Sequence, residues 1–488
     1  MVSRFSTDTT TLYANALKIM SSLPDCVMDL ASKFVDEGFE IALVGGPVRD
    51  AFLGIKPHDL DFTTSAMPDE TERILSTWGT VWAIGKEFGT IGAKNGDVIV
   101  EVTTYRDERY DLNSRKPVVA FGDNLEGDLS RRDFTVNAMA MCLPDMILHD
   151  PYNGLQDLSE GLLRTPVGSH QSFDDDPLRI MRAGRFVAQL GFSVCDDVFD
   201  AMVSMRDRLG IVSAERIQSE LVKLICSKHV RLGLELLVDT GVCDIVLPEF
   251  SQLKNTVDEH NRHKDVYEHT LTVVEKAIAL ETDENGVVPA PDFKLRFAAL
   301  MHDVGKPATR KFEEDGTVSF HHHELVGAKM TNKRMKILKF DKQTIKDVTL
   351  LVALHLRFHG YSDQAWTDSA VRRYVCDAGD MLERLNRLTR SDCTTRNKKK
   401  MLKLSKAYDD LESRIVALRE KEELAAIRPE LNGEEIMELL NLKPGREVGV
   451  AYKFLLNLRL DEGILGKEVV KSRLLKWWSE NRNNLFSA

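Results

Sequence analysis

Two aspartates separated by one apolar residue, Asp59 and Asp61, are the side chains in this sequence with the clearest capacity for chemistry. At the two-residue period of a β-strand, both carboxylates point to one face and Leu60 is buried behind them. Neighbouring carboxylates repel each other unless a cation lies between them, and oxygen ligands of this kind favour a hard divalent metal. The pattern predicts a Mg²⁺ site on a strand, although an isolated Asp-x-Asp is more often a solvated strand edge.

A glycine turn precedes the two aspartates. Residues 41–44 have the apolar composition of a buried strand, Gly45 and Gly46 end that strand, and Pro47 suits the first turn of a short helix. Such a turn offers unblocked backbone N–H groups, and Arg49 adds a cation one turn into the helix. Both features suit a phosphate chain. Together with the Mg²⁺ site they predict a metal-dependent site for a nucleoside triphosphate.

A second polar group lies in residues 131–137, where we expect the start of a helix. Arg132 and Asp133 come first, and Asn137 lies one helical turn past Asp133, so these side chains would share a polar face. Arginine suits a triphosphate, whereas an aspartate or an asparagine suits a sugar hydroxyl. A surface ion pair on a helix is an equally good interpretation of this stretch taken alone.

A third group recurs at every third residue: Asp176, Arg179 and Arg182. The stretch from Asp174 reads as a helix, because acidic residues stabilise a helix N-terminus and Pro177 suits the first turn. The three side chains would share one face of that helix. Charge compensation at the helix end, beside a solvated basic face, explains the pattern equally well.

Imidazoles and carboxylates recur on otherwise apolar helical segments between residues 266 and 392. Burying such groups costs free energy unless they share a ligand, so the pattern predicts a metal site in the core of a helical bundle. A transition metal suits histidine ligands. The pattern indicates metal binding, and it does not by itself indicate catalysis. The six positions are His269, His302, Asp303, His323, His355 and Asp392.

The elements that must position these groups are expected to form a small mixed sheet followed by helices. The chain has 488 residues, 43% of them hydrophobic and 29% charged, which is ordinary for a globular protein of three or four domains. The segment 104–129 is too polar for a core and is expected to be a loop beside the site, mobile over residues 105–117. Everything after residue 213 reads as helix. The other expected elements are helices within 1–36 and at 68–78 and strands at 80–84, 90–93 and 98–103.

Composition and charge narrow the class of protein. No stretch approaches the roughly eighteen apolar residues of a membrane helix, and residues 1–10 lack a secretion leader, so we expect a cytoplasmic protein. Seven cysteines without Cys-x-x-Cys spacing argue against zinc ribbons and disulfides. The net charge of −11 argues against RNA binding through bulk electrostatics. Any RNA contact must be local, and the basic stretches are 329–346, 396–400 and 467–476.

Five motifs follow one another in the chain: Gly45-Gly46-x-Val-Arg49, Asp59-x-Asp61, Arg131-Arg132-Asp133-Phe-Thr-x-Asn137, Asp175-Asp176-x-x-Arg179 and Ser213-x-Glu215-Arg216-Ile. In this order they resemble the class II tRNA nucleotidyltransferases, the bacterial CCA-adding enzymes of the polymerase-β-like superfamily. The region with the histidines resembles the HD superfamily of metal-dependent phosphohydrolases. Two residues depart from the family pattern, because Asp175 stands where Glu is usual and Asn153 where Gly is more common.

The resemblance implies a role for each site residue. Asp59 and Asp61 would hold Mg²⁺ and carry catalysis. The HD metal, a transition metal, would be bound by His269, His302, Asp303 and Asp392. The implied nucleotide contacts are Gly46, Arg49 and Arg132 for the triphosphate, with Gly45 beside them, Asp133 and Asn137 for the ribose, Asp176 and Arg179 for the base, and Arg182 as a further contact.

The implied reaction is the addition or repair of the 3′-terminal CCA of tRNA from CTP and ATP, without a nucleic-acid template. The implied partners are the tRNA 3′ end and the two nucleotides, with no membrane and no obligate protein partner. Two alternatives stay open: a bacterial poly(A) polymerase, and an HD phosphohydrolase whose head only binds nucleotide. The implied fold is α+β, with N-terminal helices (1–35), a mixed-sheet nucleotidyltransferase head (36–165), a helical neck (166–255), an HD domain (256–400) and a helical C-terminal region (401–488).

Overall fold

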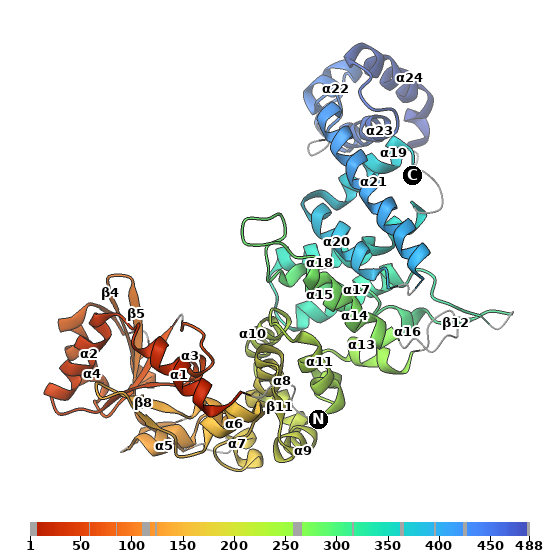
Figure 1. The fold of residues 1–488 in the computed structure, drawn as a ribbon. Helices are drawn as coiled ribbons and strands as arrows, with labels where there is room; N and C mark the ends of the chain where they lie inside the picture. The colour runs from red at the N-terminus through yellow and green to blue at the C-terminus, as the bar shows by residue number, and fades with distance from the viewer. Residues whose placement is uncertain are drawn as a thin grey trace. The chain divides into compact units, whose positions relative to one another are not determined.

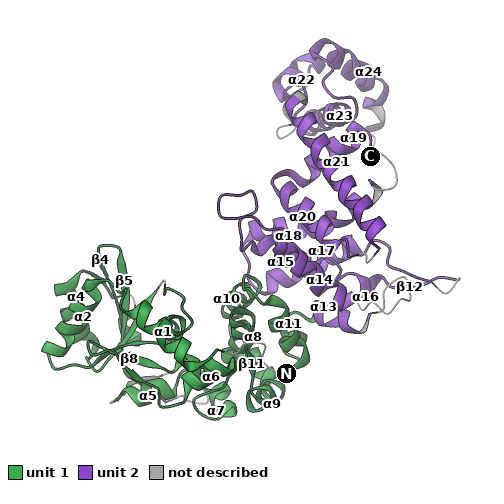
Figure 2. Cartoon of the chain, in the orientation of Figure 1, with its two compact units in different colours: residues 1–248 green, residues 249–488 purple. Residues whose placement is uncertain are grey.

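The chain forms two compact units, Met1–Pro248 and Glu249–Ala488 (Figure 2). The first unit is mixed α and β, and the second is almost entirely helical. No helix in the described part of the chain is both long and apolar enough to cross a membrane. The finer division into five domains stays a prediction. The structure, a computed structural model, describes residues 7–57, 59–83, 85–109, 118–122, 124–256, 266–314, 317–361, 366–394, 397–422 and 427–485.

A seven-stranded mixed sheet forms the core of the first unit (Figure 1). Its strand order is β3-β4-β5-β2-β1-β8-β9, in which β2 and β5 are parallel and the other neighbouring pairs are antiparallel. The expected mixed sheet is confirmed, except that residue 84 lies outside the described residues. The strands are Ile41–Val44 (β1), Leu60–Thr64 (β2), Thr80–Trp82 (β3), Thr90–Asn95 (β4), Val98–Thr104 (β5), Ala140–Cys142 (β8) and Ile147–His149 (β9).

Four helices pack around this sheet. The first helix packs on α3, and the second packs on α4, which also contacts β3, β4 and β5. Leu12 and Met20 are buried, as their helical spacing predicts, but Leu17 is 70% exposed because it lies off the apolar stripe of its helix. The helices are Thr9–Met20 (α1), Asp25–Asp36 (α2), Gly46–Phe52 (α3) and Pro68–Trp78 (α4).

The predicted loop at 104–129 is wrong at both of its ends. Arg106–Arg109 (β6) and Val118–Phe121 (β7) form a two-stranded antiparallel ribbon, and Leu125–Ser130 (α5) is a short helix. Charges of both signs along β6 hide the alternation by which a strand is usually recognised. The central part of the predicted loop, residues 110–117, lies outside the described residues.

Helix α8 is the central element of the rest of the first unit, and it packs against α10 and α11. It crosses α11 closely, because a Cβ on Gly233 would lie 2.6 Å from the carbonyl oxygen of Gly184. The elements are Gly154–Glu160 (α6), Leu162–Leu163 (β10), Ser169–Asp175 (α7), Leu178–Leu190 (α8), Ser193–Val194 (β11), Asp196–Met205 (α9), Ala214–Ile225 (α10), Val230–Asp239 (α11), Cys243–Val246 (α12) and, across the boundary, Pro248–Ser251 (α13).

The helix predicted to begin at Asp174 is interrupted. Asp175 ends α7, Asp176 has an extended backbone with φ of −140° and ψ of 98°, and α8 starts at Leu178. Pro177 explains the break, because proline disfavours the helical conformation of the residue before it. Asp176 therefore lies in the joint between two helices.

A bundle of helices forms the first part of the second unit. Within it α14 packs on α15 and α20, and α17 packs on α18. A small hairpin of β12 and β13 interrupts the predicted helical run. The elements are Val266–Ala279 (α14), Phe293–Met301 (α15), Lys306–Thr309 (α16), Lys311–Phe312 (β12), Val318–Ser319 (β13), His323–Ile337 (α17), Lys342–Leu354 (α18), Asp368–Ala378 (α19), Leu382–Asp392 (α20) and Lys398–Glu422 (α21).

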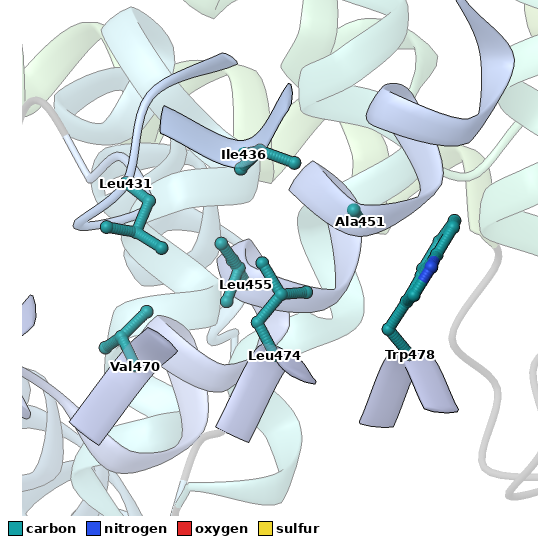
Figure 3. Close-up of a cluster of buried hydrophobic side chains, with 7 residues drawn as sticks. All are labelled: Leu431, Ile436, Ala451, Leu455, Val470, Leu474 and Trp478. Carbon is teal, nitrogen blue, oxygen red and sulfur yellow. The ribbon is translucent and has the colours of Figure 1, made fainter. Parts of the chain in front are cut away.

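Three further helices, Gly433–Leu440 (α22), Arg446–Glu462 (α23) and Lys467–Leu485 (α24), enclose a small apolar core of their own. Figure 3 shows its buried side chains converging from the three helices and, through Leu431, from the segment before α22. Glu430 ties this module together by accepting hydrogen bonds from the backbone N–H groups of Leu465 and Gly466. The members of the core are Leu431, Ile436, Ala451, Leu455, Val470, Leu474 and Trp478.

Candidate active site and metal cluster

Three carboxylates lie together on one face of the sheet. Asp59 directly precedes β2 and Asp61 lies within it; both are exposed, and Leu60 between them is buried, as the sequence pattern predicts. Asp61 is paired with Glu101 of the parallel strand β5, which places the third carboxylate beside the first two. Partial burial, the charge of Glu101 and then that of Asp59 raise the pKa of Asp61, and Arg132 opposes the shift.

Sequence reasoning missed Glu101. Its only local signal is an exposed charge in the alternating strand 98–104, and its partnership with Asp61 depends on a parallel pairing between strands that are distant in sequence. The mutual repulsion of three carboxylates fits a divalent cation, and an all-oxygen donor set is the one that Mg²⁺ prefers.

A pocket of about 440 Å³ adjoins these carboxylates. Seven arginines and three aspartates line it, so its charge suits a polyphosphate. It brings together every nucleotide contact implied by the motifs: Gly45, Gly46, Arg49, Arg132, Asp133, Asn137, Asp176, Arg179 and Arg182. Asp61 also lines this pocket, which joins the carboxylate face to the arginine-rich wall.

The glycine turn between β1 and α3 forms one wall of this pocket. Gly45 has a φ of +72°, which favours glycine, and a Cβ there would lie 2.8 Å from Nη1 of Arg132 and would displace that guanidinium. Arg49 is held at the start of α3, where its Nη1 donates to Oδ1 of Asn137 at 2.6 Å and its Nε donates to Asp50 at 2.9 Å. Proline at the first turn of α3 is as predicted.

The residues 131–137 do not form the start of a helix, which corrects the prediction. The arginine pair and Asp133 lie in a turn after α5, and residues 135–137 form a 3₁₀ turn. Oδ1 of Asp133 explains the difference, because it accepts from the backbone N–H of Phe134 at 2.8 Å and so competes with helical bonding. Asp133 and Asn137 nevertheless lie together, as predicted, because Nδ2 of Asn137 donates to the same Asp133 oxygen at 3.0 Å.

Asp128, to which the motif reading gave no role, holds both arginines of this turn. It is 1% exposed and accepts from Arg131 Nη2 at 2.9 Å and from Arg132 Nη2 at 3.3 Å. It also accepts from the Thr63 hydroxyl on β2 at 3.3 Å. Burial opposes its ionisation, but the charges of Arg132 and Arg131 outweigh burial and lower the pKa of Asp128. The signal in sequence is its spacing of three and four residues from the arginines.

Asp133 pairs with Arg182. Nε of Arg182 donates to Oδ2 of Asp133 at 2.7 Å, and its Nη2 lies 2.5 Å from the same oxygen. Burial opposes ionisation, but Arg182 and the hydrogen bond from Asn137 prevail and lower the pKa of Asp133 to about 2. The carboxylate therefore orients groups of the pocket wall.

The predicted base-reading pair already has partners within the chain. Oδ2 of Asp176 accepts from Arg216 at 2.9 Å, and its Oδ1 accepts from the backbone N–H of Leu178 at 3.1 Å. Arg179 is 7% exposed and donates to the Ser172 hydroxyl at 2.8 Å and to the backbone carbonyl of Arg131. Both side chains line the pocket, but a nucleotide base must exchange some of these bonds to be read by them.

Glu220 and Arg185 form a second ion pair at the wall of the pocket, and neither residue was predicted from the sequence. Glu220 on α10 is 3% exposed and accepts from Nη1 of Arg185 at 3.0 Å. The guanidinium of Arg185 lies 4.5 Å from the centre of the Phe186 ring, and that of Arg182 lies 5.3 Å from it. The aromatic face and the buried carboxylate thus fix two cations that line the pocket.

The predicted histidine cluster exists in the second unit as two adjoining groups of three. One group is His269, His302 and Asp392, and the other is Asp303, His323 and His355; within each, the ligand atoms lie within 4.8 Å of one another. The six side chains come from the ends or starts of α15, α17, α18 and α20 and from within α14. All six predicted positions therefore converge.

The imidazoles of this cluster are oriented for ligation. Nδ1 of His302, His323 and His355 each lies 2.7–2.8 Å from a backbone carbonyl three residues earlier, which fixes the ring and leaves Nε2 free to bind. These three Nε2 atoms are buried and make no hydrogen bond, while Oδ2 of Asp303 lies 2.9 Å from Nζ of Lys306 and 3.2 Å from Nε2 of His302. Buried polar atoms without partners are costly, so their arrangement fits bound metal.

Three families match successive parts of the chain. Residues 41–164 match the poly A polymerase head domain, residues 191–253 the probable RNA and SrmB-binding site of polymerase A, and residues 266–418 the HD domain. An A-adding tRNA nucleotidyltransferase of Deinococcus radiodurans is 32% identical over 90% of this chain and 95% of its own. A CCA-adding enzyme of Streptococcus uberis is 40% identical over 48% of this chain and 59% of its own.

Solved structures share the fold. The CCA-adding enzyme of Bacillus stearothermophilus in complex with CTP has a TM-score of 0.66 at 21% identity, over 94% of this chain and 98% of that one. The Thermotoga maritima CCA-adding enzyme complexed with tRNA has a TM-score of 0.59 at 18% identity, over 96% and 98%. The fold and the site define a nucleotidyltransferase whose polymerase-type head is followed by an HD domain. More narrowly, the chain belongs to the tRNA nucleotidyltransferase family.

Proposed function

We propose that this chain adds cytidine and adenosine monophosphates, from CTP and ATP, to the 3′ end of tRNA and so builds or repairs the terminal CCA. The observation that carries the proposal is the face on which Asp59, Asp61 and Glu101 adjoin a pocket with seven arginines. The carboxylates suit divalent metal and the arginines suit a triphosphate, which are the two requirements of nucleotidyl transfer. With tRNA as its substrate, the protein would act in the cytoplasm.

The chain's own side chains would align the reactants. Asp59, Asp61 and Glu101 would hold Mg²⁺, and Arg49 and Arg132 would bind the triphosphate so that its α-phosphorus faces the tRNA 3′-hydroxyl for in-line attack. When bound, Mg²⁺ supplies positive charge that lowers the proton affinity of that hydroxyl and neutralises the leaving pyrophosphate. The new bond joins the 3′-oxygen to the α-phosphorus, the bond to pyrophosphate breaks, and the hydroxyl proton passes to solvent.

Base choice would rest on Asp176 and Arg179. Cytosine and adenine both present an amino donor beside a ring-nitrogen acceptor, whereas uracil and guanine present a carbonyl beside a ring N–H. A carboxylate accepts from the amino group and a guanidinium donates to the ring nitrogen. This pair accepts C and A alike, so the choice between them must come from the size of the pocket as the primer grows.

The proposal is tested with three tRNA acceptors that end before CCA, after the first C, and after both C residues. Each is incubated with Mg²⁺ and with CTP, ATP or both. We expect C to be added to the first two acceptors, one A to follow, and extension to stop. A long A tail would instead identify a poly(A) polymerase, and no extension of any acceptor would contradict nucleotidyl transfer to tRNA.

Addition of A alone is a second candidate for the same site. It is favoured by one observation, namely that the relative matching 90% of this chain is an A-adding enzyme, whereas the CCA-adding relative of Streptococcus uberis matches 48% of it. In the same experiment, restricted A addition would extend only the acceptor that already ends in both C residues.

We also propose that the HD cluster binds a transition metal and hydrolyses phosphate esters, such as 2′,3′-cyclic phosphates or phosphomonoesters. The supporting observation is the set of three buried imidazole Nε2 atoms without hydrogen bonds, on His302, His323 and His355. His269, His302 and Asp392 would form one ligand set, and Asp303, His323 and His355 the other. Imidazole ligands favour transition metals over Mg²⁺, which prefers oxygen.

A further inference from the structure

The hairpin formed by α17 and α18 carries six exposed lysines and a single exposed acid, Asp341, between residues 329 and 346. In the part of the chain that the structure describes, none of these lysines has an ion-pair partner. The remaining cation of this stretch, Arg334, is paired with Glu249 at 2.9 Å. The six are Lys329, Lys333, Lys336, Lys339, Lys342 and Lys346.

Their spacing gathers the positive charge along the hairpin. Lys329, Lys333 and Lys336 follow the i, i+4, i+7 pattern of one helix face, and Lys342 and Lys346 repeat it on α18. The turn between the helices carries Lys339, so the end of the first row and the start of the second adjoin. The hairpin therefore presents a local positive surface on a chain whose net charge is −11.

This arrangement works against local stability. Lys342 lies in the first turn of α18, where the helix dipole disfavours a cation, and like charges four residues apart repel each other. Asp341, the residue before α18, is the single exposed acid of this stretch, and one carboxylate offsets only part of the repulsion among six lysines. Residues that lower the stability of their own helix without full compensation inside the chain are typical of a binding surface.

The same two helices contribute to the metal cluster. His323 is the first residue of α17, and His355 directly follows α18. At about 1.5 Å per helical residue, Lys329 and Lys336 lie roughly 9 and 20 Å along the axis from His323. The hairpin thus runs from the cluster at one end to the lysine rows and the turn at the other.

We propose that these lysine rows bind the sugar–phosphate backbone of tRNA. The inference rests on the proposed function, because it takes tRNA as the macromolecular substrate, and it assigns to the HD unit a surface that grips it. Lysines act as separate point charges without bidentate geometry, which suits the sequence-independent neutralisation of successive phosphates. Because the rest of the chain is acidic, polyanions are attracted only where such a surface is concentrated.

The test compares two triple variants of the full chain. Lys333→Glu/Lys336→Glu/Lys342→Glu reverses the proposed surface, and Lys403→Glu/Lys406→Glu/Arg419→Glu makes the same charge change at exposed positions of α21. The dissociation constant of tRNA is measured across a salt series. We expect the first variant to bind about tenfold or more weakly at low salt, with a log–log salt slope smaller by about 2 to 3, as the loss of three phosphate contacts requires.

The measurements distinguish a failure of the proposed tRNA-binding surface from a failure of the proposed function. We expect the control variant to keep the wild-type slope and both variants to keep the wild-type KM for CTP, while the hairpin variant shows a raised KM for tRNA. Unchanged affinity and slope in the hairpin variant, or an equal loss in the control, would overturn the inference while nucleotide addition stands. Wild-type protein that neither binds nor extends tRNA would instead overturn the proposed function. Helical content measured by circular dichroism confirms that each variant is folded.

Discussion

At the scale of single residues, the site depends on buried carboxylates that hold cations in place. Asp128 orients the arginine pair, Asp133 orients Arg182, and Glu220 orients Arg185. Each acid is less than 10% exposed, so removing its charge leaves a cation without its partner in a poorly solvated place. The proposed triphosphate site would thus be ordered before any nucleotide binds.

Ionisation of Asp133 makes the stability of the fold depend on pH. Its folded pKa of about 2 lies below the roughly 3.9 of an unfolded aspartate, so it stabilises the fold above pH 4 and the contribution is lost as the pH falls toward 2. We expect Asp133→Asn to lower the free energy of unfolding at pH 7 by about 2 kcal/mol and to weaken its dependence on pH between 4 and 2. Denaturant unfolding across this range measures both.

The exposed Asp36 provides the control for this prediction. Asp36→Asn should leave the free energy of unfolding at pH 7 within about 0.5 kcal/mol of wild type, as is usual for an exposed position. If Asp133→Asn behaved in the same way as Asp36→Asn, the carboxylate would contribute nothing to the fold and its place in the pocket wall would need another explanation.

At the scale of elements, the joint between α7 and α8 holds the two side chains that we propose read the incoming base. Asp176 lies in that joint and Arg179 in the first turn of α8, so one local structure presents both groups to the pocket. Their present partners, Arg216 and Ser172, hold them in place until a base takes over some of the hydrogen bonds.

We therefore expect Asp176→Ala and Arg179→Ala to relax discrimination against UTP and GTP as well as to slow addition. Each lost contact that the wrong base leaves unpaired costs about 1 to 3 kcal/mol, which corresponds to a change in selectivity of tenfold or more. The measurement is kcat/KM for all four nucleotides. Asp174→Ala, which removes an acid of the same segment that does not line the pocket, is the matched control. A pure loss of rate, with the four-nucleotide preference unchanged, would disprove the base-reading role.

The same elements show what sequence patterns could and could not predict. The strand, glycine turn and helix from residue 41 to residue 52 were predictable because each signal acts on its immediate neighbours. The turn at residues 131–134 could not be predicted in this way, because the Asp133 side chain accepts a hydrogen bond from the backbone N–H of Phe134 and so competes with helix formation. Glu101 was missed because its role depends on the pairing of β5 with β2, which no local periodicity reveals.

At the scale of the whole molecule, two compact units hold two separate clusters of candidate functional side chains. The carboxylates and the arginine pocket lie wholly within residues 1–248, and the histidine cluster lies wholly within residues 249–488. The six cluster positions were predictable from sequence as a group, because imidazoles recur on apolar helices there. The arrangement in two groups of three required the packing of five helices.

We expect His302→Ala to lose bound transition metal and any phosphohydrolase activity while nucleotide addition stays within about twofold of wild type. His302 is fully buried in the cluster, so its loss removes a ligand that no exposed residue can replace. Metal analysis of the purified protein and assays of both activities check this. The exposed His321, replaced by alanine, should leave all three measurements unchanged. Wild-type protein without stoichiometric transition metal would reduce the cluster to a packing module.

The most direct test of the account is single-turnover CMP incorporation into tRNA that lacks CCA, compared between wild type and Asp61→Asn. Loss of a metal-binding carboxylate that removes several kcal/mol of transition-state stabilisation should slow incorporation by about a thousandfold or more. The dissociation constant of tRNA should stay within about twofold, because the proposed RNA contacts are the lysines of the α17–α18 hairpin, and Asp36→Asn should match wild type in both. CMP incorporation by Asp61→Asn at a rate close to that of wild type would contradict the assignment of this face as the catalytic site.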